Sequence, residues 1–189
     1  MADRLVDKVV DKRVIDTNVL IVASAGDDAS PFPADATPVK KAELRLKVLE
    51  WLIGFERGGC HLVMDYHWTI PGEYQRKISE QDYGWLVVKE KLDRNEIHWV
   101  GLEFDKDGHA LLCDRLRDVV HDRADRKMVA SALQAGGRDG GCNLVNACDT
   151  DWYDWEEALQ AAGIDVEQLL GEWCRACWHR KRDDEPEPD

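Results

Sequence analysis

The sequence lacks two features that would assign it to a common class: a long apolar run and an excess of positive charge. No apolar run is long enough to cross a membrane. The first 13 residues scatter charges among their few apolar positions, which argues against a secretory signal. The chain has 25 basic and 38 acidic residues, a net charge of −13, so phosphate neutralisation alone does not suit it. We therefore expect a cytoplasmic protein without a membrane partner.

The cysteine and histidine spacing typical of a disulfide framework or a zinc site is also missing. The six cysteines lie in a chain with no sign of an oxidising compartment. The pair in 174-CRAC-177 has the spacing of half a zinc site, but no second C-x-x-C and no His pair follows it. We interpret the cysteines as free thiols; a partial zinc site that includes His179 is the alternative.

Short apolar runs alternate with segments of helical spacing along most of the chain. The runs predict strands at 9–15, 60–64, 96–104, 142–147 and 164–169. The helical spacing predicts helices at 43–55, 71–78, 82–93, 110–120, 125–136 and 155–163. Strands that alternate with helices imply a parallel sheet covered on both faces. The predicted fold is α/β, a three-layer α/β/α sandwich around a mostly parallel sheet.

The predicted domain covers residues 1–172, and 173–189 form a C-terminal extension. The end of this extension, 183-DDEPEPD-189, has the composition of a disordered, solvated tail.

Acidic residues stand where predicted strands end and helices begin. In 14-VIDTNVLIVA-23, Asp16 interrupts two apolar runs, and a buried carboxylate is costly unless it is paired or coordinates a metal. Asp149 follows a later predicted strand, and sites in parallel sheets form beyond the carboxyl ends of the strands. Glu73 and Asp125 open predicted helices. We expect these four acids at one edge of the sheet.

These segments resemble the four motifs of the PIN-domain nucleases, over about residues 10–170. The run VIDTNVLIVA is similar to the family's opening motif, in which Asn follows the first Asp by two places. IPGEYQRKI and DRKMVASAL resemble the helices that carry the second and third acids. LVNACDTDW resembles the fourth, D-x-D-aromatic motif. The resemblance implies a PIN-like fold and a metal-dependent nuclease.

The resemblance also implies roles for individual residues. Several carboxylates close together raise one another's pKa unless a cation joins them, and Mg²⁺ or Mn²⁺ suits oxygen ligands. Asn18 is a supporting residue, expected to hydrogen-bond a carboxylate or a metal-bound water. Asp149 is the favoured fourth acid and Asp151 the alternative. The expected catalytic and metal-binding residues are therefore Asp16, Glu73, Asp125 and Asp149, with Asp151 as a further ligand.

Each acid also has a purely structural interpretation. Asp16 could cap a helix. Glu73 could be a solvated acid favoured by the helix dipole. Asp125 could belong to a capping arrangement with Asp122. Asp154, with Glu157 three residues later, has the pattern of a capping box for the last predicted helix.

Basic and aromatic residues near the acids are candidates for substrate contact. The basic side chains best placed for phosphate are Arg76, Lys77, Arg126 and Lys127, which could instead form surface ion pairs. Trp152 or Trp155 could stack on an unpaired base, although core packing is the favoured interpretation. Asp65 and His67 are interpreted as surface or loop residues, and an accessory role at the site is the alternative for His67.

The function that these observations favour is a metal-dependent endoribonuclease acting on single-stranded RNA. Three alternatives remain: a structure-selective DNase, a non-catalytic PIN-like nucleic-acid-binding module, and a toxin with the same chemistry, masked by a protein antitoxin. Trp173 and Trp178 could serve an antitoxin or a homodimer.

Overall fold

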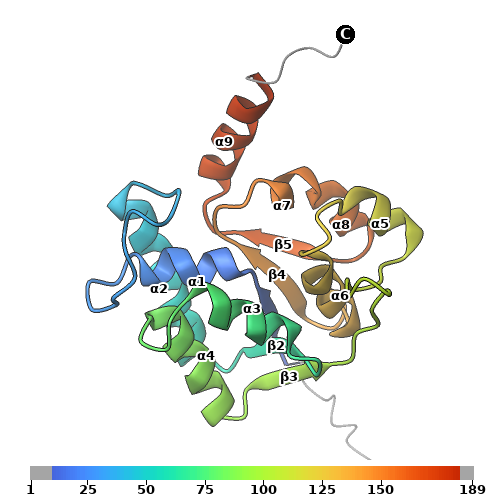
Figure 1. Ribbon diagram of the computed structural model, residues 1–189, viewed down its shortest axis with the longest axis horizontal. Helices are drawn as coiled ribbons and strands as arrows, with labels where there is room; N and C mark the ends of the chain where they lie inside the picture. Colours follow the sequence, from blue (N-terminus) through green and yellow to red (C-terminus); the bar gives the residue numbers. More distant parts are fainter. Residues whose placement is uncertain (1–9, 184–189) are drawn as a thin grey trace, which may run out of the picture.

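The computed structural model describes residues 10–183 and contains one five-stranded, all-parallel sheet with the strand order β3-β2-β1-β4-β5 (Figure 1). The strands are β1 (Lys12–Ile15), β2 (His61–Asp65), β3 (Ile97–Val100), β4 (Cys142–Asn146) and β5 (Asp165–Gln168). The sheet confirms the predicted α/β fold and places β1, the strand that precedes Asp16, at its centre.

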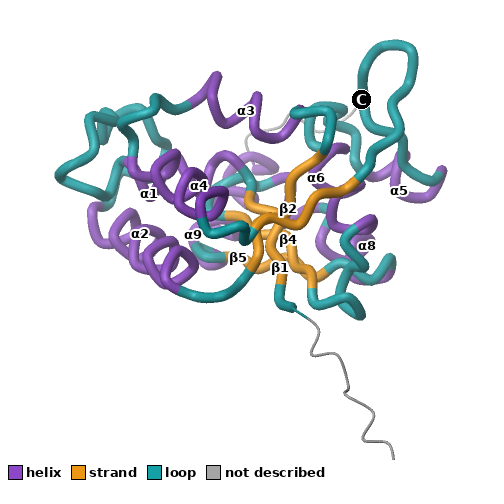
Figure 2. Tube along the Cα trace, turned by 90° about the horizontal axis from the view of Figure 1, so that it is seen from below, coloured by secondary structure: helices purple, strands orange, loops and turns teal. Residues whose placement is uncertain are grey.

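Helices cover both faces of this sheet. They are α1 (Thr17–Ser24), α2 (Ala42–Arg57), α3 (Thr69–Lys77), α4 (Tyr83–Asp93), α5 (Asp114–Val119), α6 (Arg126–Gln134), α7 (Asp151–Asp154), α8 (Glu156–Ala161) and α9 (Gly171–Asp183). Figure 2 shows α1, α2 and α4 on one side of the strands and α5, α6 and α8 on the other. Within residues 10–183, no helix combines the length and the apolar character that a membrane span requires.

The register of the central strands explains why polar residues meet at one edge. Ile15 at the end of β1 pairs with Val145 of β4, and both are buried. The backbone N–H of Asp16 donates to the carbonyl of Val145 (3.0 Å). The residues that follow the apolar part of each strand therefore leave the sheet side by side, at its carboxyl edge.

The segment after β3 differs from the prediction. The sequence pattern predicts a strand over 96–104 and a helix over 110–120, but β3 ends at Val100 and α5 begins only at Asp114. Between them the chain doubles back: Phe104 forms an isolated antiparallel bridge with Ala110, and Gly108 adopts a positive φ of 85° in the turn. Part of the segment 96–104 is thus a loop despite its alternating pattern, because the turn places Phe104 outside the sheet.

The predicted domain division at the C-terminal end stays a prediction. The predicted boundary at residue 172 falls inside α9, which continues to Asp183. The tail expected to be disordered lies, from residue 184 onward, outside the described residues.

Candidate acidic site at the carboxyl ends of the strands

Asp16 is the most buried of the candidate acids, with 7% of its surface exposed. Its Oδ1 accepts a hydrogen bond from the backbone N–H of Asn18 (2.9 Å), which makes Asp16 the N-cap of α1. Its Oδ2 accepts a hydrogen bond from the indole N–H of Trp152. The capping interpretation is therefore correct for Asp16. It leaves a ligand role open, because a carboxylate offers about four acceptor positions and these two bonds occupy only part of them.

The charges of the candidate acids raise one another's pKa at the carboxyl edge of the sheet. Burial, together with the negative charges of Asp149 and Glu73, raises the pKa of Asp16 to about 7. Burial, together with the charges of Asp16, Asp122 and Asp149, raises the pKa of Asp125 to about 8. Residues more than a hundred positions apart thus act on one another's charge. The cluster of Asp16, Asp125 and Asp149 has a deficit of positive charge.

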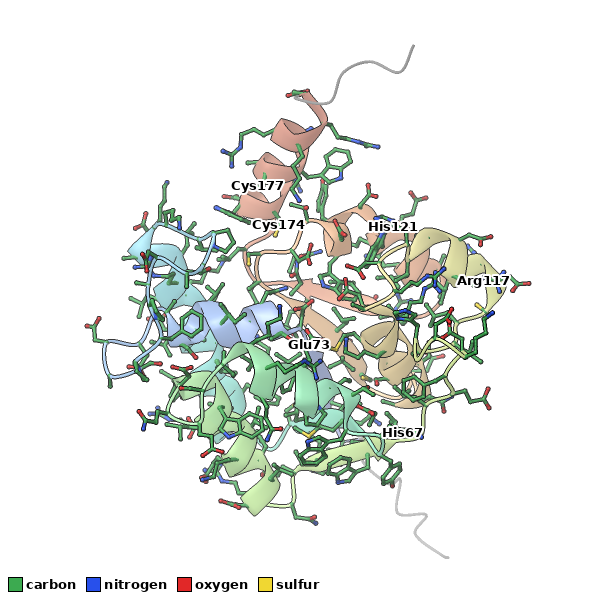
Figure 3. All side chains as sticks on the ribbon, viewed as in Figure 1. His67, Glu73, Arg117, His121, Cys174 and Cys177 are labelled. Atoms are coloured by element: carbon green, nitrogen blue, oxygen red, sulfur yellow. The ribbon has the colours of Figure 1, made fainter. Side chains whose placement is uncertain are left out.

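Glu73 belongs to the same site but is already neutralised. Its Oε1 accepts a hydrogen bond from the hydroxyl of Thr17 (2.6 Å), and its Oε2 forms an ion pair with Nζ of Lys127 (2.5 Å). Burial acts to raise the pKa of Glu73, but the charge and hydrogen bonds of Lys127 and Thr17 hold it below its ordinary value. Figure 3 shows Glu73 near the middle of the molecule.

The neighbour of Glu73 fixes α3 against the central strand. The hydroxyl of Tyr74, which is fully buried, donates a hydrogen bond to the carbonyl oxygen of Ile15 (2.5 Å). This bond holds the helix that carries Glu73 beside the end of β1, one residue before Asp16.

Asp149 and Asp151 lie where the segment after β4 leads into α7. Oδ1 of Asp149 accepts a hydrogen bond from the backbone N–H of Asp151 (2.9 Å), so Asp149 also shapes the turn. The side chain of Asp151 is 36% exposed, and its Oδ2 lies 3.9 Å from Nε2 of His121. The charge of Asp149 acts directly on Asp16 and Asp125. This arrangement favours Asp149 over Asp151 as the fourth acid.

Asn18 holds the edge together rather than contacting a carboxylate through its side chain. Its Nδ2 donates to Oδ1 of Asn146 (2.9 Å), and its Oδ1 accepts from the backbone N–H groups of Ala147 (2.8 Å) and Cys148 (3.3 Å). The described residues include no carboxylate that accepts from this amide, because its Nδ2 donates to Asn146 instead; a bond to a metal-bound water stays a prediction. Asn18 is thus a clamp between the start of α1 and the end of β4.

Replacing this clamp should lower stability. We expect Asn18→Ala to reduce the free energy of unfolding by about 1–2 kcal/mol. The side chain of Asn146 and the backbone N–H groups of Ala147 and Cys148 would then lack the hydrogen bonds that Asn18 makes to them. The thermal midpoint should fall by roughly 3–6 °C, measured by circular dichroism. Asn143→Ala, a truncation of the same residue type in β4, is the matched control. Equal midpoints for the two variants would contradict the clamp.

The four basic residues predicted to contact phosphate divide into two pairs. Lys127 is buried and engaged with Glu73, and Arg126 donates to the carbonyl oxygens of Val120 (3.1 Å) and Arg117 (3.1 Å). Arg126 and Lys127 therefore already have partners within the protein. Arg76 and Lys77 lie exposed at the end of α3.

Two tryptophans near the acids are core residues. Trp152 and Trp155 are 0% and 1% exposed, and their rings pack edge to face with centroids 5.2 Å apart. The packing interpretation is confirmed and the stacking alternative is wrong for both. Trp152 nevertheless contacts Asp16 through its N–H. Sequence reasoning missed this role, since no local pattern links two residues 136 positions apart.

Two further acids differ from their predicted roles. Asp65 is fully buried and accepts hydrogen bonds from the backbone N–H groups of Thr69 (2.9 Å) and Ile70 (2.8 Å), so it anchors the start of α3 instead of lying on the surface. Asp154 accepts a hydrogen bond from the indole of Trp178 (3.1 Å), and α8 has no side-chain cap. The capping box was wrong because α7 places Asp154 at its own end.

The cysteines of α9 are free thiols, as are the other four. Cys174 is buried, and its thiol donates to the carbonyl oxygen of Ala147 (3.5 Å). Cys174 and Cys177 lie along α9 in Figure 3.

The donor set fits a hard divalent cation in its chemistry, although the carboxylates stand apart. Among residues 10–183, no three His, Cys, Asp or Glu side chains are grouped closely enough to hold a metal ion. The acids of the cluster offer only oxygen ligands, which Mg²⁺ and Mn²⁺ prefer, and within the same residues no basic side chain pairs with Asp16. Cation binding would therefore require these side chains to move toward one another.

No known protein family, curated protein or solved structure matches this chain. The fold does not supply a function by itself, because α/β sheets support many unrelated chemistries. The function must therefore be argued from the site.

Proposed function

We propose that this protein is a PIN-like, metal-dependent endoribonuclease that hydrolyses phosphodiester bonds of single-stranded RNA. The observation that carries the proposal is the cluster of Asp16, Asp125 and Asp149 at the carboxyl edge of the sheet. Two of these acids have raised pKa values, which marks a site that lacks positive charge. The resemblance of the surrounding motifs to PIN-domain nucleases supports the same chemistry and the choice of RNA over DNA.

The residues of the chain have different roles at such a site. Asp16, Asp125 and Asp149 would hold Mg²⁺ or Mn²⁺, with Asp151 at the margin. The cation would supply a Lewis acid that activates the attacking water and offsets charge on the leaving oxygen. Trp152 and the backbone of Asn18 orient the carboxylate of Asp16 through their hydrogen bonds.

Glu73 has a different task in this arrangement. Its ion pair with Lys127 places a positive charge beside the cluster. That charge would attract the phosphate of the substrate without competing for the cation. Thr17 fixes the second oxygen of Glu73 and so keeps the pair in place.

The test is cleavage of single-stranded RNA and single-stranded DNA by purified protein in Mn²⁺, Mg²⁺ or EDTA. We expect RNA cleavage in either metal and none in EDTA. Cleavage that persists in EDTA would contradict metal dependence, and an inert protein that still binds RNA would leave a binding module.

The ion pair between Glu73 and Lys127 favours such a non-catalytic nucleic-acid-binding module. A carboxylate that is already neutralised is a poorer ligand for a cation. If the protein is a nuclease, Lys127→Met should weaken substrate binding and leave the Mn²⁺ dependence of cleavage unchanged. If it is a binding module, neither the wild type nor Lys127→Met should cleave RNA.

A further inference from the structure

Three aromatic rings form an exposed platform at the edge that also carries the acids. The platform consists of Tyr66, Trp68 and Trp99. Tyr66 is 69% exposed and Trp68 is 44% exposed. The rings of both stack on Trp99, with centroids 5.8 and 5.9 Å apart and interplanar angles of 19°. Tyr66 directly follows β2 and Trp99 lies in β3, so the platform stands at the carboxyl ends of these two strands.

The backbone at Trp68 has an uncommon conformation. Trp68 has φ 62° and ψ 25°, a left-handed conformation that bulky residues rarely adopt. The backbone N–H of Trp68 donates to the carbonyl of Asp65 (3.1 Å), and the side chain of Asp65 holds the next two N–H groups. A strained residue persists only where its surroundings fix it, and such residues cluster at ligand sites. The strain here presents a large ring to solvent.

A pocket of about 370 Å³ opens beside this platform. Trp68 and Phe104 contribute aromatic walls, and Phe104 contacts the imidazole of His67 edge to face (4.9 Å between centroids). Its volume falls within the range of small-molecule sites, which begins at roughly 300 Å³. One nucleotide is a suitable occupant by size.

The charged side chains that line the pocket are all basic, and two of them have acidic partners outside the lining: Lys127 pairs with Glu73, and Arg123 lies 3.9 Å from Asp107. The polar lining of the pocket includes Arg76, Arg123, Lys127, His67 and His109, and among the described residues no acid lines it. The whole chain has a net charge of −13, so this concentration of basic groups is local. Lys127 lines the pocket and pairs with Glu73, which connects the pocket to the acidic cluster. An anion bound in this pocket lies next to the candidate catalytic residues.

We propose that the platform and the pocket form a binding site for unpaired nucleotides of a single strand. Bases stack on Tyr66 and Trp68, one nucleotide occupies the pocket, and Arg76 and Arg123 contact its phosphates. A duplex is excluded as the ligand because its base faces are already stacked on one another. The role of this site in cleavage rests on the proposed nuclease function, in which the bound strand continues to the acids. Binding of the strand does not depend on cleavage.

The experiment measures binding in EDTA, where metal-dependent cleavage is switched off. Fluorescence anisotropy would report the affinity for labelled single-stranded oligouridylate and oligothymidylate of about 10 nucleotides. We expect Tyr66→Ala and Trp68→Leu each to raise Kd about tenfold for both strands, since each loses one stacking ring. Trp68→Phe should restore most of the affinity. Leu86→Ala, which truncates an exposed apolar side chain on α4, should bind like the wild type.

A second pair of variants protects the test against misfolding, because it changes only exposed side chains. Arg76→Ala and Arg123→Ala should each reduce the slope of log K against log salt by about 0.7, the value for one phosphate contact on a single strand. Matching thermal midpoints would show that the variants are folded.

Two results would overturn the site: unchanged affinity in Trp68→Leu, or duplex RNA that binds as tightly as the single strand. The proposed nuclease function fails separately. A wild type that binds oligouridylate through Trp68 but never cleaves it in Mn²⁺ supports the site and refutes the nuclease. If the protein cleaves RNA but substitutions of Trp68, Tyr66 and Arg123 leave its Kd and KM unchanged, the binding site is refuted and the nuclease function stands.

Discussion

Asp16→Asn should lower the rate of RNA cleavage by about 10³-fold, which corresponds to ~4 kcal/mol of activation free energy. Asp16 is the most buried acid of the cluster, and the charges of Asp149 and Glu73 act on it directly. Asparagine has nearly the same size but no charge with which to hold a divalent cation. The measurement is the initial rate in Mn²⁺ over a range of RNA concentrations. We expect the loss in kcat rather than in KM.

Two controls separate the charge of Asp16 from its structural contacts. Asp93→Asn removes an exposed carboxylate from α4, outside the site, and should leave cleavage unchanged. Trp152→Phe keeps the carboxylate but removes the N–H that donates to it, and should lower cleavage less than Asp16→Asn does. The amide of Asp16→Asn would also place its NH₂ group against one of two donors, the backbone N–H of Asn18 or the indole N–H of Trp152. This contact could lower stability, so the thermal midpoint is measured together with the rate. Full cleavage by a folded Asp16→Asn protein would refute the proposed site.

The strands and most helices could be predicted because their signals are local. Val14 and Ile15 are buried on a central strand, and this burial on both faces is what a continuous apolar run expresses. No helix is predicted over the run from Val19 to Ala23, since a short apolar run fits a strand or a buried helix equally well. The structure makes it part of α1, with Val19 and Val22 fully buried. Asp16 is consequently a cap as well as a candidate ligand.

The contacts that complete the site could not be predicted, because they join distant parts of the chain. Lys127 reaches Glu73 only because α3 and α6 meet at the edge of the sheet, and no spacing in the sequence records that meeting. The platform is hidden from the sequence for a related reason. The pattern around Trp99 is that of a core residue, yet Trp99 supports two exposed rings that follow a different strand. Strand order, which sequence pattern does not supply, brings them together.

Asp125→Asn should raise the free energy of unfolding by ~2 kcal/mol in EDTA at about pH 8, a rise of roughly 6 °C in the thermal midpoint. Burial and the charges of Asp16, Asp122 and Asp149 raise the pKa of Asp125 to about 8. Within residues 10–183 the side chain of Asp125 makes no cap bond to α6 that the amide would lose. Four pKa units correspond to ~5 kcal/mol, and the smaller figure allows for solvent around a side chain that is not fully buried.

The pH dependence has a definite sign. The pKa of Asp125 is 3.8 in its ordinary state and about 8 in the folded protein, so the folded state binds the proton more tightly. The contribution of the protonated carboxyl to stability is complete below about pH 4 and is lost as the pH rises toward 8. The difference between Asp125→Asn and the wild type should therefore be small near pH 4 and grow until about pH 8. Asp93→Asn should show no such growth.

Mn²⁺ should reverse the order of the two proteins. A cation that binds only the folded state stabilises it by RT ln(1 + [L]/Kd), about 2.7 kcal/mol at a hundredfold excess over Kd. The wild type has the full set of acids to bind it, whereas Asp125→Asn has lost one oxygen ligand and one charge. Equal gains in the two proteins, or none in either, would contradict the metal site. A carboxylate that served only the fold would give the variant the same midpoint difference with and without metal, so the inversion distinguishes a ligand from a structural acid even if no substrate has been found.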